Sequence, residues 1–240
     1  MGVYALTSST IYVGGADLSG DLRQVEGTVT GEELDVTNFG SGGWRQRIIG
    51  LHDVDATAEG FLNLGTGNVE ESLYALVGSS TASIITLGPT TGAQGEAAEL
   101  FRGVQVSFSE PETVGEAAKF TTAFKGHAQF VRGNFLGAKT STSSSSSTSA
   151  VSQAAVGTTS KVYATLHVFT AATSLNVQVQ SAATSSFAGA TTRIQFDTTS
   201  ATGGTWGTPA SGPVTDTNWR INYTIASGTF AFAVAMGIQI

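Results

Sequence analysis

The sequence predicts a mainly β protein: a β-sandwich with one flanking α-helix, followed by a second antiparallel β-sandwich. Its composition favours strands, because β-branched residues are abundant and long leucine- or lysine-rich helical stretches are missing. Glycine is common, with 30 residues, and proline is scarce, with 4, which suits strands joined by tight turns. Several segments alternate apolar and polar residues, the pattern of a strand with one buried face.

The chain is long enough for two domains, and its charge is unevenly divided between them. Residues 1–139 hold 16 of the 18 acidic residues and 8 of the 11 basic ones, a net charge of −8. Residues 140–240 carry a net charge of +1. An acidic first domain is a poor conventional DNA binder, because neutralising phosphates requires lysine and arginine.

Cysteine is absent, which excludes disulfides and thiolate metal sites. No run approaches the roughly 20 apolar residues of a membrane helix. The first residues lack the basic and apolar regions of a secretory signal. We therefore expect a protein that is made and kept in a cytoplasm and has no membrane contact.

The expected domain boundary is the serine- and threonine-rich run TSTSSSSSTS at residues 140–149. Such a run has nothing to bury and predicts a flexible linker. We place the first domain at residues 1–139, the linker at 140–160 and the second domain at 161–240. A flexible linker of this length spans about 25 Å, so the second domain is expected to lie beside the first without docking rigidly.

In the first domain, short apolar or alternating runs predict the strands. Asp53–Phe61 is the clearest, because Val54, Ala56 and Ala58 alternate with polar residues. The remaining expected strands are Ile11–Val13, Gln24–Val29, Glu33–Val36, Ser83–Leu87, Leu100–Ser109 and Lys119–Val131.

One helix is expected, at about Val69–Val77. Asn68 is a suitable N-cap with Glu71 three residues later, as in a capping box. Leu73, Leu76 and Val77 then form an apolar stripe, and Gly78 provides a stop.

The second domain alternates more strictly and shows no helical period. The expected strands start at Val162, Leu175, Trp219 and Phe230, and the last alternates to Ile240. Strands separated by turn residues predict an antiparallel sandwich.

No catalytic, cofactor or metal signature is present. His52, His127 and His167 are isolated, and we interpret each as an ordinary strand residue. Asp53 and Asp55 share a strand face, as the carboxylates of a glycosidase or a metal site would. A solvated strand face is the preferred interpretation, and a hydrolase using these two aspartates is the least favoured function.

The segment GGWRQRIIG is a candidate protein–protein contact. Trp44, Arg45 and Arg47 are of the residue types most enriched at interface hot spots, and they follow the glycine-rich stretch NFGSGG that contains Phe39. Aromatic and basic residues together also suit nucleic-acid stacking, but the surrounding negative charge favours a protein partner.

Four pieces occur in order within residues 10–135: IYVGGADLSGDLRQVEG, EELDVTNFG, RQRIIGLHDVDATAEGF and NVEESLYALVG. In this order and spacing they resemble the major tail (tube) proteins of siphophages. The pieces VYATLHVF, FAGATTRIQF, WRINYTI and FAFAVAMGI look like the accessory β-sandwich of some phage tail proteins.

The resemblance implies a tail-tube-type sandwich that forms hexameric rings, which stack into the tail tube of a virion. Double-stranded DNA would pass through the lumen without specific binding, other phage tail proteins would be partners, and the second domain would decorate the outside. The protein would be made in the host bacterial cytoplasm, as a structural protein without cofactors. Phe39, Trp44, Arg45 and Arg47 would belong to an assembly arm, and the candidate lumen-facing acids are Asp53, Asp55 and Glu59.

The alternative function is a carbohydrate- or cell-surface-binding module in the second domain. Tyr163, Trp206 and Trp219 are the aromatic residues that could stack on sugars. The alternation places Trp219 in the core, so Trp206 is the better exposed candidate.

Overall fold

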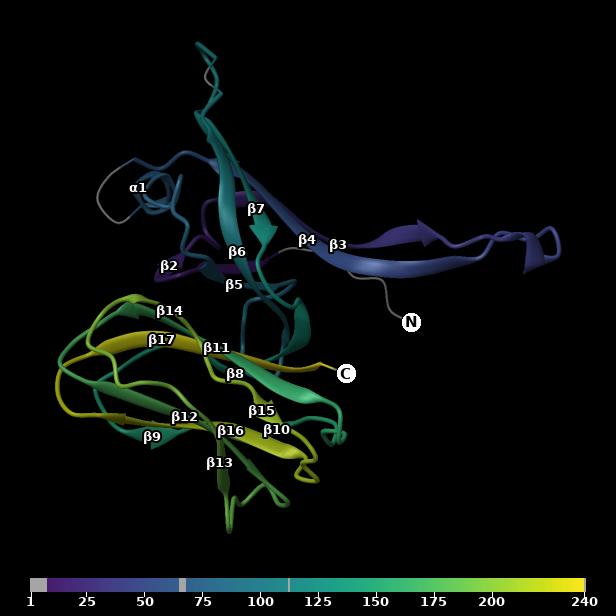
Figure 1. Cartoon of the computed structure of the whole chain (residues 1–240). Helices are drawn as coiled ribbons and strands as arrows, with labels where there is room; N and C mark the ends of the chain where they lie inside the picture. Colours follow the sequence, from purple (N-terminus) through teal and green to yellow (C-terminus); the bar gives the residue numbers. More distant parts are fainter. Residues whose placement is uncertain (1–7, 65–67, 112, 240) are drawn as a thin grey trace.

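The computed structural model describes residues 8–64, 68–111 and 113–239, and it confirms a mainly β protein built of antiparallel sheets with one short α-helix (Figure 1). No helix of these residues is long and apolar enough to cross a membrane. The strands of the described residues are β1 (Thr10–Val13), β2 (Ala16–Asp17), β3 (Leu22–Asp35), β4 (Arg47–Phe61), β5 (Ser83–Gly88), β6 (Ala97–Ser109), β7 (Lys119–Gly126), β8 (Val131–Thr142), β9 (Ser146–Ser147), β10 (Val151–Ser152), β11 (Lys161–Thr170), β12 (Leu175–Ala182), β13 (Thr191–Gln195), β14 (Gly203–Trp206), β15 (Ala210–Ser211), β16 (Asn218–Ile225) and β17 (Phe230–Gln239).

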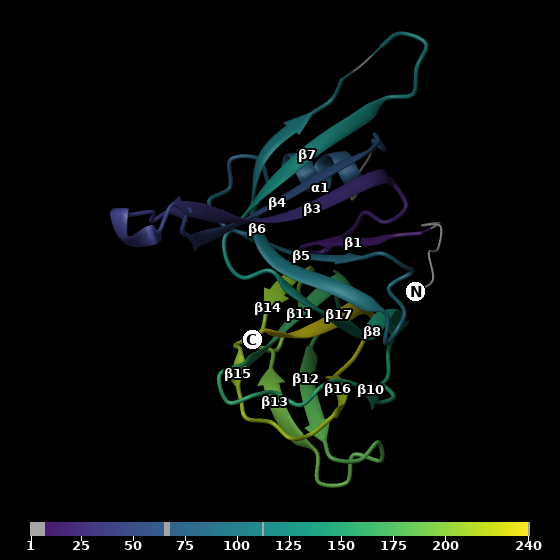
Figure 2. The same ribbon diagram turned by 90° about the vertical axis from the view of Figure 1, so that its right-hand side faces the viewer.

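One large sheet runs through both halves of the chain, in the order β14-β11-β17-β8-β6-β5-β1-β2. A second, smaller sheet in the order β10-β16-β12-β13 faces it in the C-terminal half (Figure 2). Between these two sheets lies a core that includes Trp219, Phe230 and Met236. The strict alternation of β12, β16 and β17 therefore produces the sandwich that the sequence predicts.

A four-stranded extension of the large sheet, β3-β4-β7-β6, forms the N-terminal part. Val54, Ala56 and Ala58 of β4 point into its core with Phe120 and Phe124 of β7. The expected strand Lys119–Val131 is in fact two strands: β7 ends at Gly126, and β8 begins at Val131. The break lets one segment pair with β4 and the next with β17.

The predicted helix exists but is shorter than expected, because α1 covers Val69–Tyr74 and residues beyond it form turns. Val69 and Leu73 are buried against the N-terminal core, whereas Val77 is exposed. The Asn68 side chain makes no capping hydrogen bond. Its Nδ2 atom instead donates to Leu64 O at 2.9 Å, tying the helix to the preceding loop.

The serine- and threonine-rich segment differs from the expected flexible linker. β8 continues to Thr142, which pairs with Phe230, and β9 and β10 both pair with β16. Backbone amides of Ile221 and Ile225 donate to Thr148 Oγ1 and Ser145 Oγ at 3.1 and 2.9 Å. Hydroxyl side chains that satisfy backbone donors make this run part of the sandwich.

The two halves also share a buried junction, so the C-terminal half does not hang loosely beside the first. Tyr12, Phe135 and Tyr163 pack there with Ala233 and Ala235 of β17. β17 is therefore buried on both faces: alternate side chains enter this junction and the C-terminal core.

Polar groups at the junction are paired across the two halves. Thr86 Oγ1 of β5 lies 2.9 Å from Thr165 Oγ1 and 2.8 Å from His167 Nε2, both on β11. His167 Nδ1 lies 2.8 Å from Gly14 O. The contacts of Thr86 and Gly14 fix the strands of the first half against β11. Beside them, Lys139 of β8 pairs with Asp17 of β2 at 2.7 Å.

Candidate assembly surfaces

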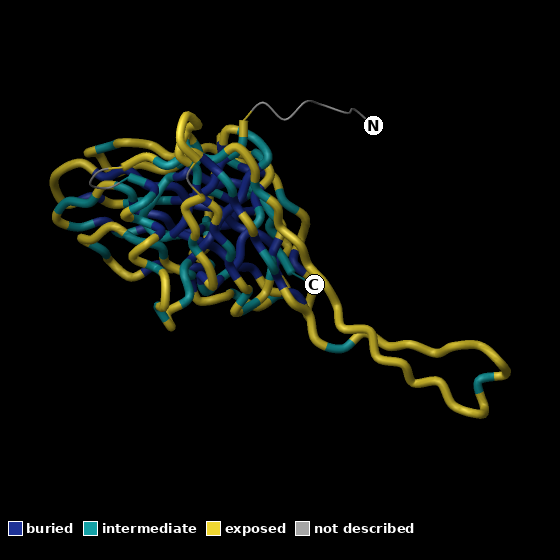
Figure 3. The backbone as a smooth tube through the Cα atoms, turned by 90° about the horizontal axis from the view of Figure 1, so that it is seen from above, coloured by how far each residue is buried: buried dark blue, intermediate teal, exposed yellow. Residues whose placement is uncertain are grey.

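The most prominent surface feature is the far half of the β3–β4 hairpin, residues 32–51, which projects from the body (Figures 1 and 3). We call these residues the arm. Strand pairing continues along it as far as Asp35 opposite Arg47. None of its residues is buried, so the arm has no core of its own (Figure 3).

The tip of the arm is ordered by local hydrogen bonds, although its glycine-rich sequence suggests mobility. Gly40 N donates to Asn38 Oδ1 at 2.8 Å, and Asn38 N donates to Ser41 Oγ at 3.0 Å. These bonds start a 3-10 turn over Phe39–Ser41. Gly42 and Gly43 then reverse the chain with φ of 60° and 84°, a conformation that glycine adopts without strain.

The structure brings the four predicted interface residues together on this arm. Phe39 is fully exposed at the tip and Trp44 is 81% exposed. Arg47 forms an ion pair with Glu33 at 2.6 Å within the hairpin. Arg45 is exposed and has no ion pair among the described residues, so it is the more available cation.

The arm is apolar as well as aromatic. Its further exposed large apolar side chains are Leu34, Val36, Ile48, Ile49 and Leu51. Exposed apolar side chains on a projecting hairpin indicate an interaction surface.

A second exposed apolar surface lies at the opposite end of the four-stranded sheet. β4 runs from Arg47 at the arm to Phe61, which pairs with Lys119 at the start of β7. The β6–β7 turn and α1 lie at this end, since Leu62 N donates to Ala118 O at 3.0 Å and Tyr74 packs on Phe108. Its exposed large apolar residues, which we call the far-end patch, are Phe61, Leu64, Tyr74, Val77 and Val114.

Within residues 8–64, 68–111 and 113–239, the four-stranded sheet has an unpaired edge on each side. Among the described residues, β3 pairs only with β4 over its 14-residue length. On one side of β6, residues 104–109 pair with β7. On the other side, the pairing with β5 stops at Gly103, which lies opposite Ser83, the first residue of β5. Edges of this kind can pair with another chain.

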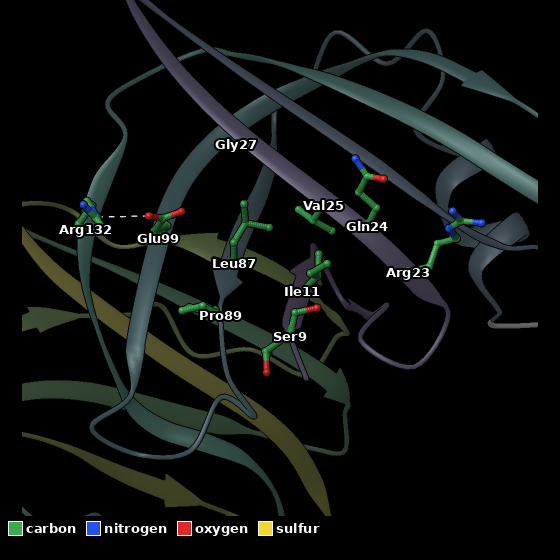
Figure 4. Close-up of a pocket in the computed structure, with 12 residues that line it drawn as sticks. Ser9, Ile11, Arg23, Gln24, Val25, Gly27, Leu87, Pro89, Glu99 and Arg132 are labelled. Atoms are coloured by element: carbon green, nitrogen blue, oxygen red, sulfur yellow. Dashed lines mark ion pairs between the residues drawn. The ribbon is translucent and has the colours of Figure 1, made fainter. Parts of the chain in front are cut away.

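A groove of about 460 Å³ lies beside the β3 edge (Figure 4). Arg23, Val25 and Gly27 line one wall of this groove. On the other side, Glu99 and Arg132 form an ion pair at 3.2 Å.

The candidate lumen-facing acids lie on the polar face of β4, away from the N-terminal core. Asp53 is exposed, but Asp55 pairs with Lys125 of β7, and Glu59 pairs with Arg23 at 3.5 Å. The Asp55 carboxylate raises the pKa of Lys125. This face is thus less negative than the acids alone suggest, because two of the three are paired with cations.

His52 and His127 line one groove of about 650 Å³. The described residues contain no group of three or more metal-ligating side chains. His167 is buried in the junction. His167 is isolated in the sequence, so nothing around it predicted this buried position.

The three aromatic side chains predicted as candidates for sugar stacking are buried or partly buried. Trp219 is fully buried in the C-terminal core, and Tyr163 is buried in the junction. Trp206 is partly buried and packs on Tyr163 with ring centroids 5.8 Å apart. No exposed pair of these rings is available, so the structure does not favour this binding surface.

No known family description matches the chain, and no curated protein matches it. A chain in the virion of a native gene transfer agent particle is similar at 15% identity and a TM-score of 0.43, covering 53% of this chain and 97% of that one. A chain of an empty gene transfer agent tail with C6 symmetry matches at 16% identity and a TM-score of 0.38, covering 46% and 80%.

The SPP1 Dit protein, described as a hub adsorption apparatus of phages infecting Gram-positive bacteria, matches at 15% identity and a TM-score of 0.39. That similarity covers 97% of this chain and 99% of the other. All three TM-scores lie below 0.5, so none of these likenesses assigns this chain a function.

Proposed function

We propose that this chain is a structural, non-enzymatic protein of a phage tail, whose copies join into closed, hexameric rings that stack into the tail tube. Other phage tail proteins would be its partners in the virion. The observation that carries the proposal is the four-stranded sheet β3-β4-β7-β6, whose two edges have no strand partner in the part of the chain that the structure describes.

The two edges lie on different sides of one sheet, so they can join one copy to the next. The edge of β3 on one subunit would pair with residues 104–109 of β6 on its neighbour. A contact between two different surfaces is heterologous, and it closes into a ring when the rotation between subunits permits. Main-chain hydrogen bonds would then continue the sheet around the ring.

The distribution of exposed apolar side chains supports assembly through the N-terminal half. Among the described residues, every exposed large hydrophobic side chain lies between Val29 and Val114. The described residues after 114 expose none, so their surface suits a position outside the tube. A permanent interface is expected to be rich in apolar area, as the N-terminal surface is.

In such a ring, the polar face of the four-stranded sheet would line the lumen. Asp53, Asp55 and Glu59 lie on that face, where Lys125 and Arg23 offset two of the carboxylates. Without a cluster of unpaired cations, the wall would not hold the phosphates of passing double-stranded DNA.

Negative-stain electron microscopy of the concentrated full chain tests the proposal, with size-exclusion chromatography across a concentration series. We expect rings or tubes that grow with protein concentration. A protein that stays monomeric at every concentration, and is also missing from the tubes of intact virus particles, would contradict it.

A further inference from the structure

We propose that the outer face of the small sheet in the C-terminal half binds a polysaccharide, whose hydroxyl groups hydrogen-bond to a row of amide side chains. The inference goes beyond the proposed function and does not depend on ring formation. We call the polar residues of this row the amide face, and it contains none of the three aromatic residues considered for sugar stacking. Its members on β12, β13 and β16 are Asn176, Gln178, Gln180, Gln195, Arg220 and Asn222.

Strand alternation puts the amide face on one side of the sheet. Alternate residues of β12 and β16 enter the C-terminal core, so the side chains between them point outward. Cross-strand pairing places Gln180 opposite Arg220, and it places Gln178 between Gln195 and Asn222. The small sheet lies at the end of the molecule away from β3 and β4 (Figures 1 and 2). Its outer face is therefore separate from the surfaces proposed for assembly.

A single direction of hydrogen bonding orders the row. A guanidinium can only donate, and Arg220 Nε and Nη2 donate to Gln180 Oε1 at 3.1 and 3.0 Å. The Gln180 amide is thereby oriented, and its Nε2 donates to Gln178 Oε1 at 3.2 Å. Gln178 Nε2 donates in turn to Gln195 Oε1 at 2.8 Å, and Gln195 Nε2 donates to Asn176 Oδ1 at 3.2 Å. Arg220 thus fixes the orientation of each amide in the chain.

Arg220 is itself held by a strained residue. The centre of its guanidinium lies 4.2 Å from the centroid of the Phe187 ring. Phe187 is buried and has φ of 56°, a left-handed conformation that is unfavourable for a bulky side chain. Strain of this kind persists where the surrounding structure holds it, and it clusters at functional sites. Here the strained residue supports the side chain that orders the amides.

The ordered row keeps hydrogen-bonding capacity for a ligand. The partly exposed Asn222 amide has no hydrogen-bond partner among the described residues. Gln178 and Gln180 each use one N–H of the amide within the row and keep the second. A sugar hydroxyl donates and accepts at once, so fixed amide N–H and C=O groups match it. Because the row is ordered in advance, less side-chain entropy is lost on binding.

The chemistry of the face favours a polysaccharide over other polymers. The described residues after 114 expose no large hydrophobic side chain, so the face lacks the apolar centre of a protein interface. Nucleic acid requires several free cations. Arg220 has no ion pair among the described residues, but Arg193 is paired with Asp216 at 3.0 Å. An open face of mostly uncharged donors and acceptors suits an extended, hydroxyl-rich chain.

Binding of the full chain to arrayed polysaccharides tests the inference, at protein concentrations too low for ring formation. The array carries purified bacterial capsular polysaccharides, O-antigens and teichoic acids, together with neutral dextran. We expect binding to at least one of these polymers. Binding should persist in high salt, because salt screens charges but leaves contacts to neutral amides in place.

Two variants then locate the site on the polymer that binds. Asn222→Ala removes an amide that the row does not need, and it should weaken binding about tenfold, the factor expected for one or two lost hydrogen bonds. Arg220→Lys keeps the charge but loses the planar fork that orients Gln180, so it should also weaken binding. The control Thr205→Ala, at an exposed position of β14 in the opposite sheet, should bind as the wild type does. Thermal melting checks that each variant is folded.

Three outcomes would overturn the inference. The wild-type chain could bind no arrayed polymer. Folded Asn222→Ala could bind as tightly as the wild type, which would place the contact elsewhere. Binding that disappears in high salt and is unchanged in Arg220→Lys would show only attraction to a positive charge. None of these outcomes bears on ring formation, which electron microscopy of the concentrated chain tests separately.

Discussion

His167 is a buried imidazole whose hydrogen bonds suit its neutral form. Since Gly14 O can only accept, Nδ1 donates to it, and Nε2 is left to accept from the Thr86 hydroxyl. Thr86 Oγ1 can in turn accept from Thr165. Protonation would reverse the direction of these hydroxyl hydrogen bonds and, at greater cost, put a charge in the apolar junction.

We expect this residue to make the fold acid-sensitive. Burial lowers the pKa of His167 to about 4, although the hydrogen bond to Gly14 O and the charge of Asp17 act in the opposite direction. The unfolded chain has an ordinary histidine pKa near 6.5 and so binds the proton first as pH falls. The free energy of unfolding should therefore decrease from about pH 7 towards pH 4, by roughly 3 kcal/mol from this group.

Urea unfolding at several pH values, at concentrations too low for assembly, measures this effect. The matched variant His167→Gln keeps polar atoms at the site but does not titrate. It should be less stable than the wild type at pH 7, and its stability should change less between pH 7 and pH 5. Parallel pH profiles of the two proteins would show that another group is responsible.

Asp17 is a nearby carboxylate that also titrates in acid. Burial raises its pKa, but hydrogen bonds from Lys139 and Ser19 outweigh this effect and hold the pKa below its usual value.

Among the elements, the arm can be removed without loss of the fold. Residues 32–51 contain no buried side chain, and Gly31 lies directly opposite His52 on the paired strand. Replacing Glu32–Leu51 by Asn-Gly would close the hairpin with a two-residue turn and keep the remaining register.

We expect this shortened chain to melt within a few degrees of the wild type, because the removed residues contribute no buried side chain to the core. Contacts through the exposed apolar side chains of the arm should be lost, while the sheet edges still allow single rings. Circular dichroism measures the stability and electron microscopy the assembly. Full-length tubes from the shortened chain would show that assembly does not need the arm.

The sequence predicts most strands because alternation is a local signal. β11, β12, β16 and β17 lie where periodicity indicates them, and β4 contains the predicted Asp53–Phe61 but begins earlier, at Arg47. It does not predict which strands pair over long distances. Nothing in the run of serine and threonine at residues 140–149 indicates that β16 and β17 will pair with it. The open edges, the far-end patch and the junction around His167 are likewise products of tertiary pairing.

Across the whole molecule, β8 and β17 bind the two halves into one sheet. Their backbones lie so close that a Cβ atom on Gly133 would sit 1.9 Å from Met236 O. β8 also contributes to both cores, with Leu136 in the C-terminal core and Val131 and Phe135 in the junction. The boundary at residue 139 thus divides a strand that both halves use.

This arrangement predicts that the fragment 1–139 will not fold as an independent unit. Removing β17 and β11 uncovers Val131, Phe135 and Leu136, each now fully or almost fully buried. Each such side chain contributes roughly 1.5–3 kcal/mol, so the loss is comparable with the 5–15 kcal/mol that stabilises a whole domain. Thermal scans should show no cooperative transition, and the fragment should aggregate through the bare edge of β8. A soluble fragment that melts sharply and still forms tubes would instead support two independent domains, and the shared sheet would then be a contact that the N-terminal half can do without.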